Sequence, residues 1–190
     1  MVYKLGVFVS RPFLHLYNKI NVHNLPKPFP QGKLVISGNH TCWIDPFWLS
    51  SVVPRHVKYL AKEELFKNPL LKALFLKAGA FPVKRGTADR KAIKFMIDTL
   101  NNDGVIGIFP EGTRNKEGVG EAHNGAAYVA LKTGSSVLPV TINISEHKFR
   151  SEVDITFHDL IKVESEKKIA KEKLNDLTQN IMKVIASRLN

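Results

Sequence analysis

The sequence predicts a single α/β domain in which a central, mostly parallel sheet is flanked by helices. Short apolar segments alternate along the chain with segments of helical period, and this alternation is typical of an α/β fold. The run 105–109 (Val-Ile-Gly-Ile-Phe) is apolar throughout, as expected for a strand that helices cover on both faces. The 190 residues suffice for one domain with a substantial core, and neither an internal repeat nor a linker divides them.

The N-terminal segment, residues 1–20, is basic, aromatic and amphipathic. It contains basic residues but no acidic one, and Arg11-Pro12 interrupts its apolar run. That run is far shorter than the roughly 20 apolar residues that span a bilayer, and no signal-peptide cleavage site follows it. Two interpretations stay open: the segment lies in the membrane interface, or it packs on the domain as a terminal helix. Residues 21–32, which include three prolines, are predicted to form an extended connector.

The first predicted strand and helix enclose a short polar loop. The strand, residues 33–37, is apolar and stops at a glycine. Aspartate is a preferred N-cap residue, and proline is favoured at the first helical position. We therefore expect Asp45 to cap a helix that starts at Pro46 and ends before Pro54.

Two further strands, at residues 57–61 and 80–83, enclose an unusually apolar helix. This helix, residues 70–78, opens after Asn68-Pro69 and is apolar almost all round, with two lysines. Lysine can extend its ammonium group away from an apolar surface. The helix is therefore expected to be either part of the core or a membrane-facing patch.

The second half of the chain continues the alternation of strands and helices. Thr87 is expected to cap an amphipathic helix, because apolar residues recur at the spacing of one helical face up to Leu100. Pro139 should disfavour a central strand, so its segment is expected to contain a bulge or to form a pocket wall. The remaining predicted strands and helices cover residues 137–142, 153–157, 122–132 and 174–185.

The positive charge of the chain is unevenly distributed. The net charge is +11, and residues 55–94 contain 11 Lys or Arg against 3 Asp or Glu, which gives this segment alone +8. Such an excess predicts an anionic partner, although a solvated basic face would explain many of the individual lysines. The sequence contains neither paired Cys/His fingers nor an RNP-like aromatic strand, so nucleic acid is not expected to be the partner.

The loop between the first strand and helix holds His40 and Asp45 five positions apart. A carboxylate that orients an imidazole produces a general base, which can take a proton from a substrate alcohol. Each residue alone also fits a structural role, and the spacing alone is a weak signal. The single cysteine, Cys42, lies in the same loop; it excludes an intramolecular disulfide and is expected to pack rather than to act as a nucleophile.

Four sequence blocks follow one another in a fixed order: Asn39-His40-x4-Asp45, Phe81-Pro82-Val83-Lys84-Arg85, Phe109-Pro110-Glu111-Gly112-Thr113-Arg114 and Val137-Leu138-Pro139-Val140. By this ordered set the chain resembles the glycerolipid acyltransferase family, most closely the 1-acyl-sn-glycerol-3-phosphate (lysophosphatidate) acyltransferases. A single block would be a weak match, so the ordered set carries the resemblance. A further segment, Lys62-Glu63-Glu64-Leu65, also fits the family pattern.

The resemblance implies an acyl transfer at a membrane surface. His40 would deprotonate the sn-2 hydroxyl of a lysophospholipid while Asp45 orients the ring, and the resulting alkoxide would attack an acyl thioester. Backbone amides near Gly112 are candidates for stabilising the oxyanion. Thr113 is expected to hydrogen-bond the acceptor or to close the turn, and Glu111 to hold the loop.

The resemblance also implies a phosphate site, for which Arg114 is the best ligand because a guanidinium offers a bidentate fork. The weaker candidates are basic residues of the neighbouring blocks, namely Arg85, Lys84 and Lys62. Pro139 is expected to shape the acyl pocket. Aromatic residues near the loop would line that pocket or belong to the core; these are Trp43, Phe47 and Trp48.

The implied partners are a lysophospholipid acceptor, a thioester of acyl carrier protein or coenzyme A, and an anionic membrane surface. No metal or cofactor is expected, and the thioester is a co-substrate. We expect a peripheral protein at the cytoplasmic membrane face, with an N-terminal segment and connector at residues 1–30 and the acyltransferase domain at residues 31–190. Two alternatives stay open: an acyltransferase for glycerol 3-phosphate, another lysophospholipid or another alcohol, and a non-enzymatic basic module that binds a membrane or nucleic acid.

Overall fold

The computed structural model describes residues 11–84, 89–112, 122–146 and 148–189. Within these residues, seven strands form one sheet: β1 (Lys19–His23), β2 (Leu34–Gly38), β3 (Val57–Lys62), β4 (Ala80–Val83), β5 (Val105–Ile108), β6 (Ser136–Ile144) and β7 (Glu152–Phe157). The helices are α2 (Asp45–Val52), the 3₁₀ helix η1 (Glu63–Phe66), α3 (Pro69–Lys77), α4 (Arg90–Asn101), α5 (Gly125–Thr133) and α6 (Lys171–Ala186). Residues 11–17 are also helical.

The order of the strands across the sheet is β1-β7-β6-β2-β5-β3-β4. β6 and β7 pair antiparallel, and the other neighbouring strands pair parallel. The prediction of one α/β domain with a mostly parallel sheet is therefore confirmed.

The strand β1 was not predicted. It occupies residues that the sequence assigns to the end of the N-terminal segment and the beginning of the extended connector. β1 lies at one edge of the sheet and pairs only with β7. Its residues are exposed or half-buried, so its sequence lacks the apolar pattern of a buried strand.

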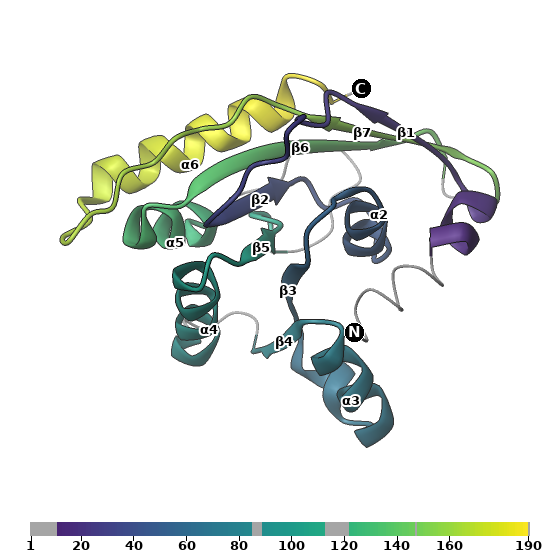
Figure 1. The fold of residues 1–190 in the computed structure, drawn as a ribbon, viewed down its shortest axis with the longest axis horizontal. Coiled ribbons are helices and arrows are strands. Elements are labelled where there is room, and N and C mark those ends of the chain that lie inside the picture. Colours follow the sequence, from purple (N-terminus) through teal and green to yellow (C-terminus); the bar gives the residue numbers. More distant parts are fainter. Residues whose placement is uncertain (1–10, 85–88, 113–121, 147, 190) are drawn as a thin grey trace.

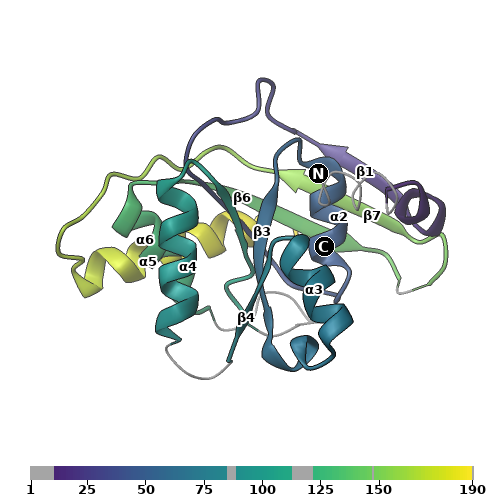
Figure 2. The same ribbon diagram turned by 60° about the horizontal axis from the view of Figure 1, so that its bottom comes forward.

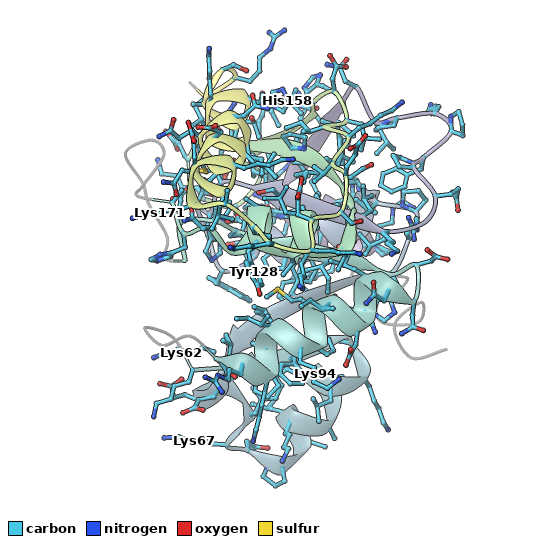
Figure 3. All side chains as sticks on the ribbon, turned by 90° about the vertical axis from the view of Figure 1, so that its left-hand side faces the viewer. Lys62, Lys67, Lys94, Tyr128, His158 and Lys171 are labelled. Atoms are coloured by element: carbon cyan, nitrogen blue, oxygen red, sulfur yellow. The ribbon has the colours of Figure 1, made fainter. Side chains whose placement is uncertain are left out.

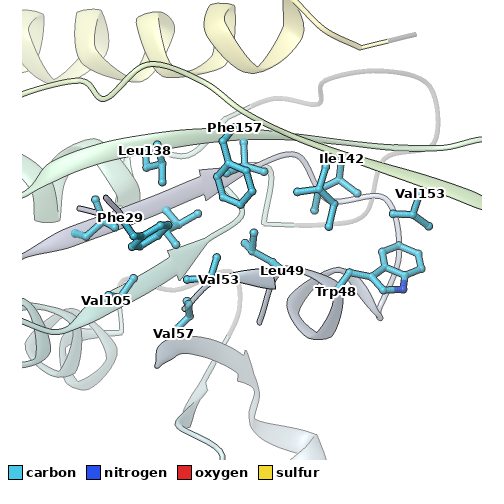
Figure 4. Packing of buried hydrophobic residues seen from close by; sticks show 14 of the residues in the cluster. Phe29, Trp48, Leu49, Val53, Val57, Val105, Leu138, Ile142, Val153 and Phe157 are labelled. Carbon is cyan, nitrogen blue, oxygen red and sulfur yellow. The ribbon is translucent and has the colours of Figure 1, made fainter. Parts of the chain in front are cut away.

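Helices cover both faces of the sheet, with α2 on one face and α4, α5 and α6 on the other (Figure 1). The central strand β2 is buried along its whole length, and its alternate residues supply the two cores. Leu34 and Ile36 belong to the same core cluster as Trp48 and Leu49 of α2, which Figure 4 labels. Val35 packs instead against α4, α5 and α6.

Pro139 lies in the middle of β6, although proline is usually restricted to edge strands. It stands opposite Ser37 of β2 and just beyond the end of β7. Its carbonyl accepts a hydrogen bond from the backbone nitrogen of His158 at 3.0 Å. Because the nitrogen and carbonyl of one strand residue point to the same side, the missing N–H faces the end of β7. The proline therefore removes one backbone hydrogen bond at the end of the ladder between β6 and β7.

One expectation for the helices is wrong: the N-cap of α4 is not Thr87, which lies outside the described residues, but Asp89, whose side chain accepts hydrogen bonds from the backbone nitrogens of Lys91 and Ala92. For α3 the structure excludes the core, which was one of two open alternatives, since none of its residues is buried. The other alternative, a membrane-facing patch, stays a prediction. The N-cap of α3 is Asn68, whose side chain accepts two backbone N–H groups, and these bonds fix the start of the helix without any core contact.

The N-terminal segment lies only partly within the described residues. Leu14 is buried in the core on the α2 face, whereas Phe13 and Leu16 are 65% and 67% exposed. One side of the segment therefore packs on the domain, and its role at a membrane stays a prediction. Of the helices in the described part of the chain, none is both long and apolar enough to cross a membrane.

Candidate active site

The parallel strands bring most of the predicted site residues to one edge of the sheet. Strands that run parallel end at the same edge, which is where ligands bind in open α/β sheets. The order of the strands places these residues in neighbouring loops. His40 and Asp45 follow β2, Glu111 and Gly112 follow β5, Lys62 ends β3, and Lys84 follows β4.

His40 and Asp45 are in direct contact within the β2–α2 loop. The distance from Nδ1 of His40 to Oδ2 of Asp45 is 2.7 Å. The side chain of Asp45 is fully buried and that of His40 is 10% exposed. In the part of the chain that the structure describes, Nε2 of His40 makes no hydrogen bond. The ring is therefore fixed through one nitrogen, and its other nitrogen is available to a substrate.

Asp45 is the first residue of α2 and not its N-cap, so that prediction is wrong. Its carboxylate turns back into the loop and accepts hydrogen bonds from the backbone nitrogens of Thr41 and Cys42, at 2.7 and 2.8 Å. Oδ1 also accepts a bond from Oγ1 of Thr41 at 3.0 Å. A carboxylate committed to these donors has no oxygen directed at the end of the helix. The same residue therefore closes the loop instead of capping the helix.

These hydrogen bonds determine which nitrogen of His40 carries the proton. Backbone N–H groups can only donate, so Asp45 receives them as an acceptor, and an ionised carboxylate has no proton to give. Nδ1 of His40 must then donate to Asp45, and in the neutral imidazole this places the lone pair on Nε2. The pair consequently has the tautomer that a general base requires.

Asn39 anchors the loop to the neighbouring strand β6. Its side-chain nitrogen donates to the carbonyl of Ile142, and its side-chain oxygen accepts from the backbone nitrogen of the same residue, both at 2.8 Å. Asn39 is 1% exposed, so these two bonds satisfy a buried amide. Asn39 belongs to a block that the sequence analysis used, but no role was predicted for it.

The imidazole of His40 packs on an aromatic stack. Its ring lies 4.5 Å from the ring of Phe109, with an interplanar angle of 23°. Phe109 stacks in turn on Tyr59, with centroids 6.2 Å apart and an angle of 12°. Tyr59 covers Gly107, where a Cβ atom would lie only 2.2 Å from Cε1 of the tyrosine. The stack restricts the ring of His40 from the side of β5 and β3.

Glu111 and Gly112 form the loop that faces His40. Oε1 of Glu111 accepts a hydrogen bond from the backbone nitrogen of His40 at 3.4 Å, and the residue is 4% exposed. The amide of Gly112 donates to the carbonyl of Phe109 at 3.1 Å, within a turn in which Gly112 has a φ of +65°. A Cβ atom on Gly112 would meet His123 at 2.9 Å. Glu111 thus supports the main chain of the histidine, and an oxyanion role for the amides near Gly112 stays a prediction.

The predicted phosphate ligands are only partly within the described residues. Lys62 is exposed and pairs with Glu64 at 3.1 Å, and the backbone nitrogen of Lys84 donates to Asp89 at 3.3 Å. Arg85, Thr113 and Arg114 lie outside the described residues.

The aromatic residues of the loop and of α2 divide between surface and core. Trp48 is 1% exposed and belongs to the core, whereas Trp43 is 62% and Phe47 43% exposed. Trp43 and Phe47 contact each other edge to face. Cys42 is half-buried against the core on the α2 face, in agreement with a packing role. Pro139 is buried within β6, and its role in an acyl pocket stays a prediction.

The geometry suits proton transfer to and from a substrate hydroxyl. A buried carboxylate, an oriented imidazole and an unoccupied Nε2 make up the base and its support. In the described residues, no group of three or more His, Cys, Asp or Glu side chains is placed to hold a metal ion.

Comparison with known proteins gives consistent matches. The sequence model of the acyltransferase family matches residues 19–143. The 1-acyl-sn-glycerol-3-phosphate acyltransferase of Bacillus subtilis is 31% identical over 139 residues, which are 73% of this chain and 69% of that protein. The lyso-ornithine lipid O-acyltransferase of Pseudomonas aeruginosa is 32% identical over 116 residues, which are 60% of this chain and 44% of that protein.

The crystal structure of the 1-acyl-sn-glycerophosphate acyltransferase of Thermotoga maritima has the same fold. It superposes with a TM-score of 0.70 over 96% of this chain and 75% of that chain, at 24% sequence identity. The matched family region contains β2, α2 and the loop with His40 and Asp45. By this match, the chain belongs to the acyltransferase family.

Proposed function

We propose that the protein transfers a fatty acyl group from an acyl thioester to the sn-2 hydroxyl of 1-acyl-sn-glycerol 3-phosphate, forming phosphatidic acid. Membership of the acyltransferase family supports the reaction class. The name of the B. subtilis relative supports the acceptor. The observation that carries the mechanism is the buried His40–Asp45 pair, whose second imidazole nitrogen is open to a substrate.

In the proposed reaction, Nε2 of His40 takes the proton of the acceptor hydroxyl as its oxygen attacks the thioester carbonyl carbon. Asp45 stabilises the imidazolium that forms, through the hydrogen bond to Nδ1. The tetrahedral oxyanion then collapses, the C–S bond breaks, and the thiolate of the carrier takes the proton back from His40. The products are phosphatidic acid and the free thiol of the carrier.

The acceptor phosphate is proposed to bind Arg114, with Arg85, Lys84 and Lys62 adding positive charge. The positions of Lys62 and Lys84 at the ends of β3 and β4 support this, because they share the sheet edge of His40. Several cations bind an acceptor with a negatively charged phosphate group more tightly than an uncharged alcohol acceptor. Glu111 supports the backbone of His40 and is not proposed to take part in the chemistry.

The carrier of the acyl group is proposed to be acyl carrier protein or coenzyme A, and no metal or further cofactor is required. The protein is proposed to act as a peripheral protein on the cytoplasmic face of the membrane. In this proposal, residues 1–30 form an N-terminal segment and connector, and residues 31–190 form the catalytic domain. The second candidate is the same chemistry on another lysolipid, which the name of the P. aeruginosa relative favours.

The test measures phosphatidic acid formed from lysophosphatidic acid, with acyl carrier protein and coenzyme A thioesters supplied separately. Wild type and His40→Ala are compared, and glycerol 3-phosphate is added as a competing acceptor. Product from the wild type alone would support the reaction and identify the donor. If neither donor gives phosphatidic acid but an acyl group is transferred to another lysolipid, that lysolipid would replace lysophosphatidic acid as the proposed acceptor. Equal product from both proteins would overturn the role of His40.

A further inference from the structure

The largest group of exposed leucines lies on η1 and α3. Within α3, Leu70 is 79%, Leu71 44%, Leu74 55% and Leu76 46% exposed, and Leu65 of η1 is 49% exposed. Scattered exposed leucines are normal on a protein surface, but Leu70, Leu71 and Leu74 lie within about 100° of one another around α3, and such a group is typical of an interaction site. We call residues 63–77 the η1–α3 unit.

The η1–α3 unit is folded and attached to the domain by few contacts. The ring of Phe75, which is the one partly buried residue of α3, packs on Phe66 of η1 at a centroid distance of 5.7 Å. Figure 1 shows α3 beyond the edge strand β4 and apart from the helices on both faces of the sheet, and Figure 2 shows it on the opposite side of β3 and β4 from α4. The leucines are thus presented by a fixed helix whose outer surface no described residue covers.

The charge around the patch is mainly positive. Residues 62–84 contain five lysines, Lys62, Lys67, Lys72, Lys77 and Lys84, against two acidic residues, Glu63 and Glu64, of which Glu64 pairs with Lys62 at 3.1 Å. Figure 3 shows Lys62, the residue just before the unit, and Lys67 projecting from the same side. A second copy of this chain would bring two such positive surfaces together, which is unfavourable. Anionic lipid headgroups would complement the lysines while acyl chains take up the leucines.

We propose that the η1–α3 unit is a docking surface for an anionic lipid bilayer. Leucines enter the interface between headgroups and acyl chains, and the lysines extend to the phosphates. Phe13 and Leu16, the exposed apolar residues of the described N-terminal helix (residues 11–17), lie on another element.

The position of the unit gives this surface a direct relation to His40. β2 and β3 are parallel members of one sheet and are separated by β5 alone, so their ends lie about 10 Å apart. The loop with His40 follows β2, and η1 follows β3 at the same edge. A bilayer held by η1 and α3 therefore lies next to the edge of the sheet that carries the loop with His40. This arrangement lets a lipid substrate reach the site without entering bulk water.

The test measures binding of the purified full chain to vesicles in the absence of any substrate, so it does not depend on the proposed reaction. Vesicles contain phosphatidylcholine alone or mixed with phosphatidylglycerol. We expect Leu70→Gln/Leu74→Gln to weaken partitioning into the mixed vesicles about tenfold or more, because two leucines no longer enter the interface. Glutamine keeps the helix propensity of the site. The control is Leu160→Gln, a leucine that is 36% exposed outside the unit and is expected to bind as the wild type does.

A second variant, Lys67→Gln/Lys72→Gln, tests the electrostatic part and leaves the leucines in place. We expect it to weaken binding to phosphatidylglycerol vesicles at low salt, with the difference disappearing at high salt. Unchanged vesicle binding by the leucine variant would overturn the proposal. The proposal would also be overturned if the wild type is a dimer and Leu70→Gln/Leu74→Gln is a monomer that still binds vesicles. The patch would then join two copies of the chain.

Discussion

Oδ2 of Asp45 lies 2.7 Å from Nδ1 of His40 and also accepts the backbone nitrogens of Thr41 and Cys42. The carboxylate therefore has two functions at once, because it shapes the loop and sets the tautomer of the base. Asp45→Asn should disturb both, since an amide has only one acceptor oxygen for these donors. We expect kcat to fall by about 10³-fold or more and stability to fall by about 1–3 kcal/mol for an unsatisfied buried donor.

Thermal unfolding and steady-state kinetics on Asp45→Asn, His40→Ala and Thr41→Val separate these effects. His40→Ala should remove turnover and leave the loop folded. Thr41→Val removes only the hydroxyl bond to Oδ1 of Asp45 and should retain most of the activity. A wild-type kcat for Asp45→Asn would show that the carboxylate is structural only.

Arg114→Ala should raise the KM for lysophosphatidic acid by about tenfold or more while kcat changes little, because a charge-assisted bond to the phosphate would be lost. Arg114→Lys should be intermediate, since lysine cannot form the bidentate pair. Kinetics with a monoacylglycerol as acceptor provide the control, because this alcohol has no phosphate. An unchanged KM for the phosphorylated acceptor would remove Arg114 from the phosphate site.

The parts of the fold that burial determines could be predicted from the sequence. β2 and β5 are continuous apolar segments, so they can be recognised in the sequence as buried strands. α4 and α6 have one apolar face, so their apolar residues recur in the sequence with the helical period. β1 could not be predicted, because an edge strand is stabilised by its pairing with β7 more than by burial of its own side chains.

The sequence predicts that Asp45 orients His40, but not the other contacts of the site. Asp45 before a proline has the sequence of a helix cap, and only the fold of the loop shows that its carboxylate also accepts the backbone nitrogens of Thr41 and Cys42. The stack of Tyr59 and Phe109 on His40 depends on the pairing of β3 with β5. Residues so far apart in the sequence carry no local signal of that contact.

Asn39→Ala should loosen the loop that carries the base. It removes both bonds to the backbone of Ile142 and leaves a buried N–H and carbonyl unpaired. We expect a loss of about 1–3 kcal/mol in the free energy of unfolding, together with a lower kcat. Denaturant unfolding compares it with Asn21→Ala, which loses one bond of 3.3 Å to Asp154 at the edge of the sheet. Equal stability of the two variants would contradict the anchoring role of Asn39.

Gly107→Ala tests whether the aromatic stack of Tyr59 and Phe109 supports His40, by a change at a residue that contacts Tyr59. The new methyl group would lie 2.2 Å from Cε1 of Tyr59, so the tyrosine ring must move, and Phe109 and His40 stack above it. We expect a destabilisation of about 1–3 kcal/mol from overpacking and a several-fold lower kcat with little change in KM. Both are measured by thermal unfolding and steady-state kinetics.

Two further variants determine whether the clash with Tyr59 is the cause. Gly125→Ala, at a position in α5 where a Cβ atom meets nothing within 4 Å, should keep full activity and stability. The double variant Gly107→Ala/Tyr59→Leu should be no less stable than Tyr59→Leu alone, because the ring that clashes is gone. Additive losses in that cycle would mean that Gly107 acts through some other neighbour. Non-additive losses would show that Gly107 acts on stability through Tyr59, the ring that stacks on Phe109 and through it on His40.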